Sequence, residues 1–244
     1  MITIRVDKLI RLALIAVIAM LAVNISPGSA EKLNLQPVTS SALEPSIFAN
    51  AILWDQLNLS SNYSVSQDFN PSWDNWDVYA ADDWNNDQTW VIKKISAQGG
   101  WTIDVNLLNA SAIHWFIYSD NAGDPAGVPG DMNEFWSISL PPTDPQIVLG
   151  GDNQHNVILN LTTPINLPPG TWWLIIFPSL NYDNYGQWGW SGTLNAVWGQ
   201  KGHLNNPGGG FGLPSGWNPG YYDCDYSFRL EGLLLSYMPL IRKP

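Results

Sequence analysis

The sequence predicts an all-β protein built as a single antiparallel β-sandwich of jelly-roll type. Some short segments alternate apolar and polar residues with a period of two, which is typical of strands that bury one face. Other segments are apolar on both faces and end at turn residues, which is typical of central strands covered on both sides. After the first 30 residues, no segment has the apolar spacing of an amphipathic helix of three turns.

Residues 1–30 have the layout of a secretory signal peptide. Basic residues precede an apolar run from Leu12 to Val23, and the small residues Gly28-Ser29-Ala30 follow a Ser-Pro break. This order predicts export, with cleavage after Ala30, and a secreted or cell-surface protein. The run is short for a transmembrane helix, which needs about 20 apolar residues. A retained anchor helix is the alternative, and we expect no integral membrane segment in the mature chain.

The rest of the chain divides into three parts by composition. Residues 31–50 are rich in Ser, Pro and Ala and are expected to lead loosely into the domain. The sandwich itself is expected over residues 51–232. Residues 233–244 follow the last expected strand and are interpreted as a C-terminal tail.

Three segments carry the alternating pattern, namely 101–107, 155–161 and 225–231. Each places a row of apolar residues on one face and mostly polar residues on the other, so each is expected to be a half-buried strand. Three further segments, which are apolar on both faces, are expected to be central strands: residues 89–95, 112–118 and 171–177.

A series of short motifs runs along residues 50–232. In chain order they are Leu53-Trp54-Asp55-Gln56, Ser66-Gln67-Asp68-Phe69, Tyr79-Ala80-Ala81-Asp82-Asp83-Trp84, Trp101-Thr102-Ile103, Tyr118-Ser119-Asp120-Asn121-Ala122-Gly123-Asp124-Pro125, Pro168-Pro169-Gly170-Thr171-Trp172-Trp173-Leu174, Trp188-Gly189-Trp190, the loop 206–212 and Ser227-Phe228-Arg229-Leu230-Glu231-Gly232. The series resembles a group of exported bacterial β-sandwich domains with little assigned activity. The resemblance implies this fold and export, and it supplies no catalytic residues.

The last residues, from Tyr237 to Lys243, form a Tyr-x-Pro-Leu-Ile-basic ending. It is similar to short endings on exported proteins of some filamentous bacteria, which implies sorting or surface retention. The alternative is a frayed terminus.

Charge and cysteine content exclude several classes of function. The formal net charge is −11, and removing the leader, which is net basic, makes the mature chain more negative. Such a surface repels phosphate backbones and anionic lipid headgroups and favours cations, so we expect no nucleic-acid partner. Cys224 is the single cysteine of the chain, so a monomer forms no disulfide. Its neighbours Asp223 and Asp225 would raise its pKa, which disfavours a catalytic thiolate.

Tryptophan is the conspicuous residue type, with 14 in the chain. Trp101, Trp115, Trp136 and Trp172 lie in strand-like patterns and are predicted to be core residues. Other aromatic residues lie in Gly- and Asn-rich surroundings, where they could form a platform that stacks on sugar rings. Capping of the core by these loops is the alternative. The candidate ligand-binding residues are Tyr182, Tyr185, Trp188, Trp190, Trp198, Trp217, Tyr221 and Tyr222.

Clusters of acidic residues are the second candidate site. Ca²⁺ prefers six to eight oxygen ligands, so the clusters are hypothesised to bind structural calcium as a cofactor. The competing interpretation is that the carboxylates cap turns by accepting bonds from backbone amides. The candidate calcium ligands are Asp82, Asp83, Asp87, Asp120, Asp124 and Asp131.

No catalytic residues are predicted. The chain lacks a Gly-x-Ser-x-Gly elbow and His-x-x-x-His spacing, and His114 is interpreted as a packing histidine. The preferred function is therefore an exported non-catalytic module that binds polysaccharide or cell-surface matrix. The alternatives are a structural surface or adhesion component with protein partners and, third, a secreted glycan hydrolase using Glu134. The sequons at Asn58, Asn62, Asn109 and Asn160 matter only if the source glycosylates proteins.

Overall fold

The structure is a computed structural model that describes residues 45–47, 50–100, 105–193 and 198–237. These residues belong to one compact unit, Leu43–Pro244. The expected signal peptide, Trp101 and the ending 238–244 lie outside the described residues. None of the helices within the described ranges is long and apolar enough to cross a membrane.

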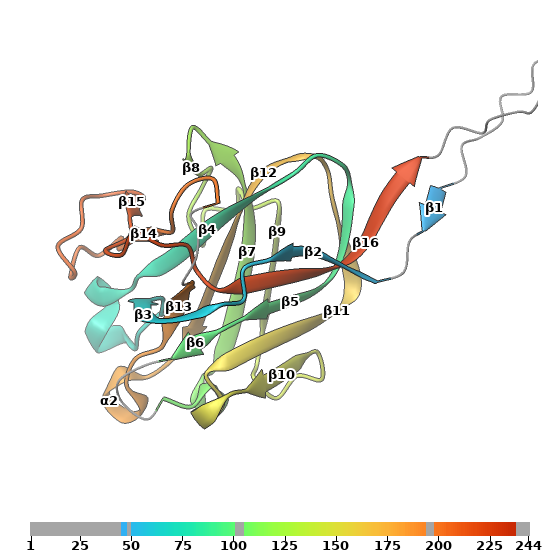
Figure 1. Cartoon of the computed structure of the whole chain (residues 1–244). Helices are drawn as coiled ribbons and strands as arrows, with labels where there is room; N and C mark the ends of the chain where they lie inside the picture. The colour runs from blue at the N-terminus through green and yellow to red at the C-terminus, as the bar shows by residue number, and fades with distance from the viewer. Residues whose placement is uncertain (1–44, 48–49, 101–104, 194–197, 238–244) are drawn as a thin grey trace, which may run out of the picture. The chain divides into compact units, whose positions relative to one another are not determined.

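The predicted all-β antiparallel sandwich is confirmed (Figure 1). The first sheet has the order β1-β16-β5-β11-β10, and β2 also pairs with β16. Its ladders are all antiparallel. Its strands are β1 Pro45–Ile47, β2 Ala51–Asp55, β5 Trp90–Ala97, β10 Ile147–Gly150, β11 Asn156–Leu167 and β16 Phe228–Tyr237.

The second sheet has the order β15-β14-β4-β12-β7-β8, with β9 also pairing with β7. Its strands are β4 Tyr79–Asn86, β7 Ala112–Asn121, β8 Asp124–Pro125, β9 Trp136–Leu140, β12 Gly170–Ser179, β14 His203–Asn205 and β15 Asn218–Pro219. A small third sheet, β3-β13-β6, consists of β3 Leu59–Val65, β13 Gly189–Thr193 and β6 Gly99–Gly100. The helices are short: η1 Pro71–Trp76, η2 Leu107–Asn109, η3 Asp152–Gln154 and α2 Tyr182–Tyr185.

The core lies between the first and second sheets. Ile95 on β5 and Leu174 on β12 are fully buried in it, and the rings of Trp84 on β4 and Phe228 on β16 meet edge to face at 5.9 Å. Burial of this apolar surface is the main stabilising term, worth roughly 25 cal/mol per Å². The predicted core residues Trp115 and Trp172 are buried, and Trp136 packs against the same cluster while half-buried.

Strand β12 confirms the expectation for segments that are apolar on both faces. Trp172, Leu174 and Ile176 join the main core. Trp173, Ile175 and Phe177 belong to a second cluster, against which Trp217 packs from the 206–220 segment. Both faces of the strand are therefore covered, which explains the continuous apolar run.

Several expected boundaries differ from the structure. Val105 and Asn106 are not in a strand, and Leu107 begins η2, because the Asn106 side chain accepts a bond from the Leu108 amide and caps a turn. The sheet also extends into both expected flanking segments. β1 pairs with the end of β16, so the lead 31–50 contributes a strand, and the boundary at residue 232 falls inside β16.

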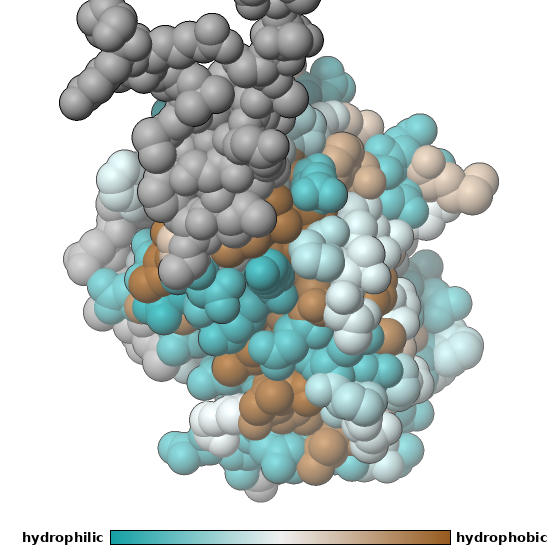
Figure 2. Space-filling view, turned by 90° about the vertical axis from the view of Figure 1, so that its right-hand side faces the viewer, coloured by the Kyte–Doolittle hydropathy of each residue, from teal (hydrophilic) through white to brown (hydrophobic). Residues whose placement is uncertain are grey.

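Outside the core, apolar residues reach the surface in separate patches. Figure 2 shows one face of the molecule, on which apolar groups are interrupted by polar ones. Single exposed apolar residues are normal for a soluble domain. A functional interpretation therefore needs a concave arrangement of such residues.

Replacing Gly232 by alanine is expected to destabilise the domain by about 1–3 kcal/mol, as overpacking typically does. Gly232 is buried in β16 where the pairing with β5 shifts register, and a Cβ there would overlap the Val91 carbonyl oxygen. Gly150→Ala on β10 is the matched control, because its Cβ meets no atom within 4 Å. Urea unfolding of both variants checks this, and equal losses would contradict the steric explanation.

Candidate functional site

The predicted platform aromatics do not converge on one concavity, and two of them are corrected to core residues. Trp188 and Trp190 are fully buried. The Trp188 indole donates to the His155 carbonyl, and the Trp190 indole donates to the Ser227 carbonyl, each at 3.0 Å. Because both rings face the interior and use their polar atoms there, neither is presented to a ligand.

The remaining predicted aromatics lie in separate places. Trp198 is 55% exposed and meets Trp54 edge to face beside β2. Trp217 is half-buried and donates to the Gly127 carbonyl. Tyr221 and Tyr222 are exposed and line a pocket of about 110 Å³. Tyr185, also exposed, ends α2.

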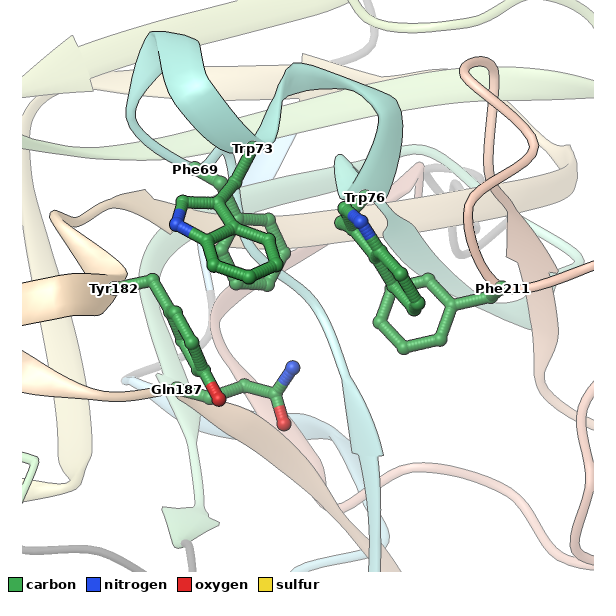
Figure 3. A pocket seen from close by; sticks show the side chains of 6 residues that line it. All are labelled: Phe69, Trp73, Trp76, Tyr182, Gln187 and Phe211. Atoms are coloured by element: carbon green, nitrogen blue, oxygen red, sulfur yellow. The ribbon is translucent and has the colours of Figure 1, made fainter.

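Tyr182 is the predicted residue that lines a pocket made mainly of aromatic side chains. This cavity, called the aromatic pocket below, has a volume of about 170 Å³. Figure 3 shows Trp73 and Tyr182 on one side of an open space, Trp76 and Phe211 on the other, and Gln187 near the Tyr182 hydroxyl. Its lining residues are Phe69, Trp73, Trp76, Tyr182, Gln187 and Phe211.

Helix η1 places the two indoles on one face. Asn70 is extended and Pro71 occupies the first turn, where its fixed φ and missing N–H suit a helix start. A 3₁₀-helix has three residues per turn, so Trp73 and Trp76 project on the same side. Their rings meet at 62° with centroids 6.3 Å apart.

Helix α2 supplies Tyr182 and the turn that leads to Gln187. The Asn181 side chain caps it by accepting from the Asn184 amide, and Gly186 ends it with φ 73°, a conformation that favours glycine. The Gly186 carbonyl and the Trp188 amide are both bonded to the buried side chain of Gln67. The segment is thereby anchored to the core next to Trp188.

Hydrogen bonds tie η1 to α2. The Asn70 side chain accepts from the Tyr182 amide at 2.9 Å and donates to Asp183 at 3.0 Å. The other Asp183 oxygen accepts from the Trp73 indole at 2.9 Å. Because Trp73 is fixed through its nitrogen, its orientation does not depend on a ligand.

The third wall comes from the glycine-rich segment near Phe211. The Asn206 side chain donates to the carbonyls of Asn75 and Asp77 and accepts from the Phe211 amide. A Cβ at Gly208 would overlap the backbone of Asn75, so glycine is needed for this close approach. As a result, Phe211 lies against Trp76 with the rings 5.0 Å apart and at 84°.

The lining is mostly apolar, with two polar side chains. None of its six residues is a carboxylate, histidine, serine or cysteine, and the polar groups are the Tyr182 hydroxyl and the Gln187 amide. Among the described contacts, no hydrogen bond engages the Tyr182 hydroxyl or the Gln187 amide. These two groups remain available to a ligand.

The calcium candidates are distributed among other interactions. Asp120 accepts from the Trp173 indole and Asp131 from the Val128 and Asn133 amides. Asp124 faces His203 at 3.4 Å, and Asp87 is exposed. In the part of the chain that the structure describes, no three His, Cys, Asp or Glu side chains are grouped so that they could hold a metal ion. Calcium binding stays a prediction.

The other two candidates, Asp82 and Asp83, are buried, as is Asp225, whose charge acts on both; these three residues are called the buried acids below. Asp82 accepts from the Gln56 side chain and the Tyr226 amide. Burial and then the charge of Asp225 raise the pKa of Asp82 well above its usual value. Burial raises the pKa of Asp83 to about 7 and that of Asp225 to about 6.

Asp83 and Asp225 both hold the segment that begins at Trp198. Asp225 accepts from the Trp198 amide and Asp83 from the Gln200 amide. The pKa of the neighbouring Cys224 is raised, by burial first and then by Asp82 and Asp225, in line with the predicted unreactive thiol.

His114 is a packing residue, as predicted. Its ring stacks on Phe177 at 4.7 Å, and its two nitrogens are hydrogen-bonded to the hydroxyls of Ser139 and Ser179. Burial lowers its pKa, so the neutral form is favoured.

Comparison with known proteins adds no assignment to this geometry. No protein-family model matches the chain, and no curated protein is similar to it.

Proposed function

We propose that this protein is an exported or surface-displayed binding module, without catalytic activity, that recognises a glycan or matrix polymer through the aromatic pocket. The observation that carries the proposal is a concave site with five aromatic walls and two free polar groups. Ligand sites typically combine apolar walls with a few placed polar groups.

The size of the pocket limits what enters it. Pockets for drug-sized ligands have volumes of about 300–1,000 Å³, whereas this one encloses about 170 Å³. It therefore suits one ring or one head group of a larger polymer. The hydrogen bonds at Asn70, Asp183 and Asn206 fix the walls before binding, which lowers the entropic cost of association.

Replacing Trp76 by leucine is expected to reduce retention on the cognate polysaccharide at least about fivefold, because one cavity wall is lost. Trp76 is 39% exposed, so the melting temperature should change little. Retention on insoluble polysaccharides and a glycan array measure the effect. Phe135→Leu is the matched control, since Phe135 is 44% exposed and packs on Trp172 instead. Unchanged retention by Trp76→Leu would contradict the proposal.

One observation favours the alternative of a surface component with protein partners. Ile52, which is 56% exposed, and Trp198 line a groove of about 260 Å³ beside β2. Grouped exposed apolar side chains mark interaction sites. If Trp198→Ser abolished attachment to cell-surface protein while Trp76→Leu did not, this alternative would replace the proposal.

A further inference from the structure

The angles between the rings of the aromatic pocket decide which ligand it suits. Trp73 and Tyr182 meet at 65°, and Trp76 and Phe211 meet at 84°. Phe69 and Tyr182 meet at 66° behind them. A sugar ring needs a flat aromatic face on which to stack, whereas steeply inclined rings form the walls of a box. Figure 3 shows such walls on two sides of the open space.

A box of aromatic faces is suited to a compact cation. The π face of Trp, Tyr or Phe is electrostatically negative and attracts a cation within about 6 Å of its centre, and quaternary ammonium groups are recognised in this way. The Trp73 indole donates to the carboxylate of Asp183. Because the N–H donates to a carboxylate, electron density in the indole ring increases and its face becomes more negative. The carboxylate adds its own negative potential at the rim of the pocket.

The charges around the pocket have the same sign. Asp74 lies on η1, Asp68 precedes this helix and Asp77 follows it. Burial, and then the negative charges of Asp68 and Asp74, raise the pKa of Asp77. No Lys or Arg occurs between residues 43 and 92 or between 95 and 200. Of the described lysine and arginine residues, Lys94, Lys201 and Arg229 are paired elsewhere, with Glu231, Asp223 and Asp55, and Lys93 lies on β5, which contributes no residue to the pocket. No positive side chain in these segments would compete for the pocket.

We propose that the aromatic pocket binds a methylated ammonium group, such as a choline-type substituent, carried by the glycan or matrix ligand. The inference rests on the proposed function and names the part of the ligand that the pocket accepts. The trimethylammonium group would contact the aromatic walls formed by Trp73, Trp76 and Tyr182.

The test is a titration of the exported protein with tetramethylammonium and choline, followed by tryptophan fluorescence and calorimetry. Sodium chloride at equal concentration controls for ionic strength. The neutral isostere 3,3-dimethylbutan-1-ol has the same shape without the charge. We expect both cations to bind and the isostere to bind at least fivefold more weakly. Equal binding of the isostere would overturn the inference, because the pocket would then be merely apolar.

Substitutions at Trp76 and Asp183 separate the contribution of the aromatic walls to cation binding from that of the carboxylate charge. Trp76→Leu should weaken tetramethylammonium binding at least fivefold, and Trp76→Phe should restore most of it. Asp183→Asn keeps an acceptor for the Trp73 indole, removes the charge and gives up the bond from the Asn70 side chain. Cation binding should fall about two- to fivefold, and unchanged binding of the isostere shows that the walls are still in place. A cation affinity that neither variant changes would overturn the inference.

Failure of the inference and failure of the proposed function are distinguishable. If neutral saccharides bind at Trp76 and tetramethylammonium does not displace them, the pocket is a sugar site, and the inference alone fails. If no probe binds and Trp76→Leu also leaves polysaccharide retention unchanged, both fail.

Discussion

Replacing Trp190 by alanine is expected to lower the free energy of unfolding by about 3–5 kcal/mol, the usual cost of truncating a buried indole. The Trp190 ring is fully buried, stacks on Tyr226 at 5.2 Å and donates to the Ser227 carbonyl. Its loss leaves a cavity and removes a buried hydrogen bond. Because domains are stable by only about 5–15 kcal/mol, the variant should unfold at much lower urea concentration.

Trp198→Ala is the control for this experiment, since its indole is 55% exposed. We expect it to cost about 1 kcal/mol or less, the value of one edge contact with Trp54. If Trp190→Ala retained full stability but lost ligand binding, the placement of this ring in the core would be wrong and a platform on Trp190 would be restored.

The strands were predictable where burial alone sets the pattern. β12 is apolar on both faces because sheet pairing and two clusters enclose it. The strand expected over 101–107 was predicted from a different pattern, the alternation of apolar and polar residues, and its described end is wrong. There the Asn106 side chain accepts a hydrogen bond from the Leu108 amide and closes a turn. The spacing of apolar residues does not reveal this interaction between a side chain and the nearby backbone.

The site was predictable only in part, for a geometric reason. Alternation suggests that Trp188 and Trp190 share a face, but it cannot say whether that face is inward; both rings lie in the main core. The Trp73-x-x-Trp76 spacing after Asn70-Pro71 is a local signal that could have placed two indoles on one side of a 3₁₀ turn. Nothing local indicates Phe211, which reaches Trp76 through the tertiary bonds of Asn206.

The domain is expected to be more stable at pH 6 than at pH 8, with a melting temperature higher by about 3 °C or more, which is roughly 1 kcal/mol for a chain of this size. Burial raises the pKa of Asp83 to about 7 and that of Asp225 to about 6, and raises that of Asp82 further. An acid whose pKa is higher in the folded state than in the unfolded state binds its proton more tightly when folded. Its stabilising effect is therefore present at low pH and lost as the pH rises through the folded value.

Groups whose pKa is lowered by folding limit the pH range over which this stabilisation is seen. Burial lowers the pKa of both His114 and His203, so the unfolded chain gains protons more readily below about pH 6.5. Asp55, whose pKa is lowered, loses stabilisation in the acid range below that. The gain from the buried acids should therefore be clearest between pH 8 and pH 6. Calorimetric melts across this range measure it, and a melting temperature that rises toward pH 8 would contradict it.

The substitution Asp225→Asn tests whether the buried acids Asp82, Asp83 and Asp225 cause this pH dependence of stability. One Asp225 oxygen accepts from the Trp198 amide, and the other is buried without a partner. The amide keeps the first bond, removes the charge that raises the pKa of Asp82, and places a donor where an unpaired oxygen was. We expect stabilisation of about 1–3 kcal/mol at pH 8 and a flatter pH profile. Asp223→Asn, at a side chain 87% exposed, should change neither. A variant at Asp225 that melts lower at pH 8 would show that its carboxylate is needed in the charged form to hold the Trp198 segment.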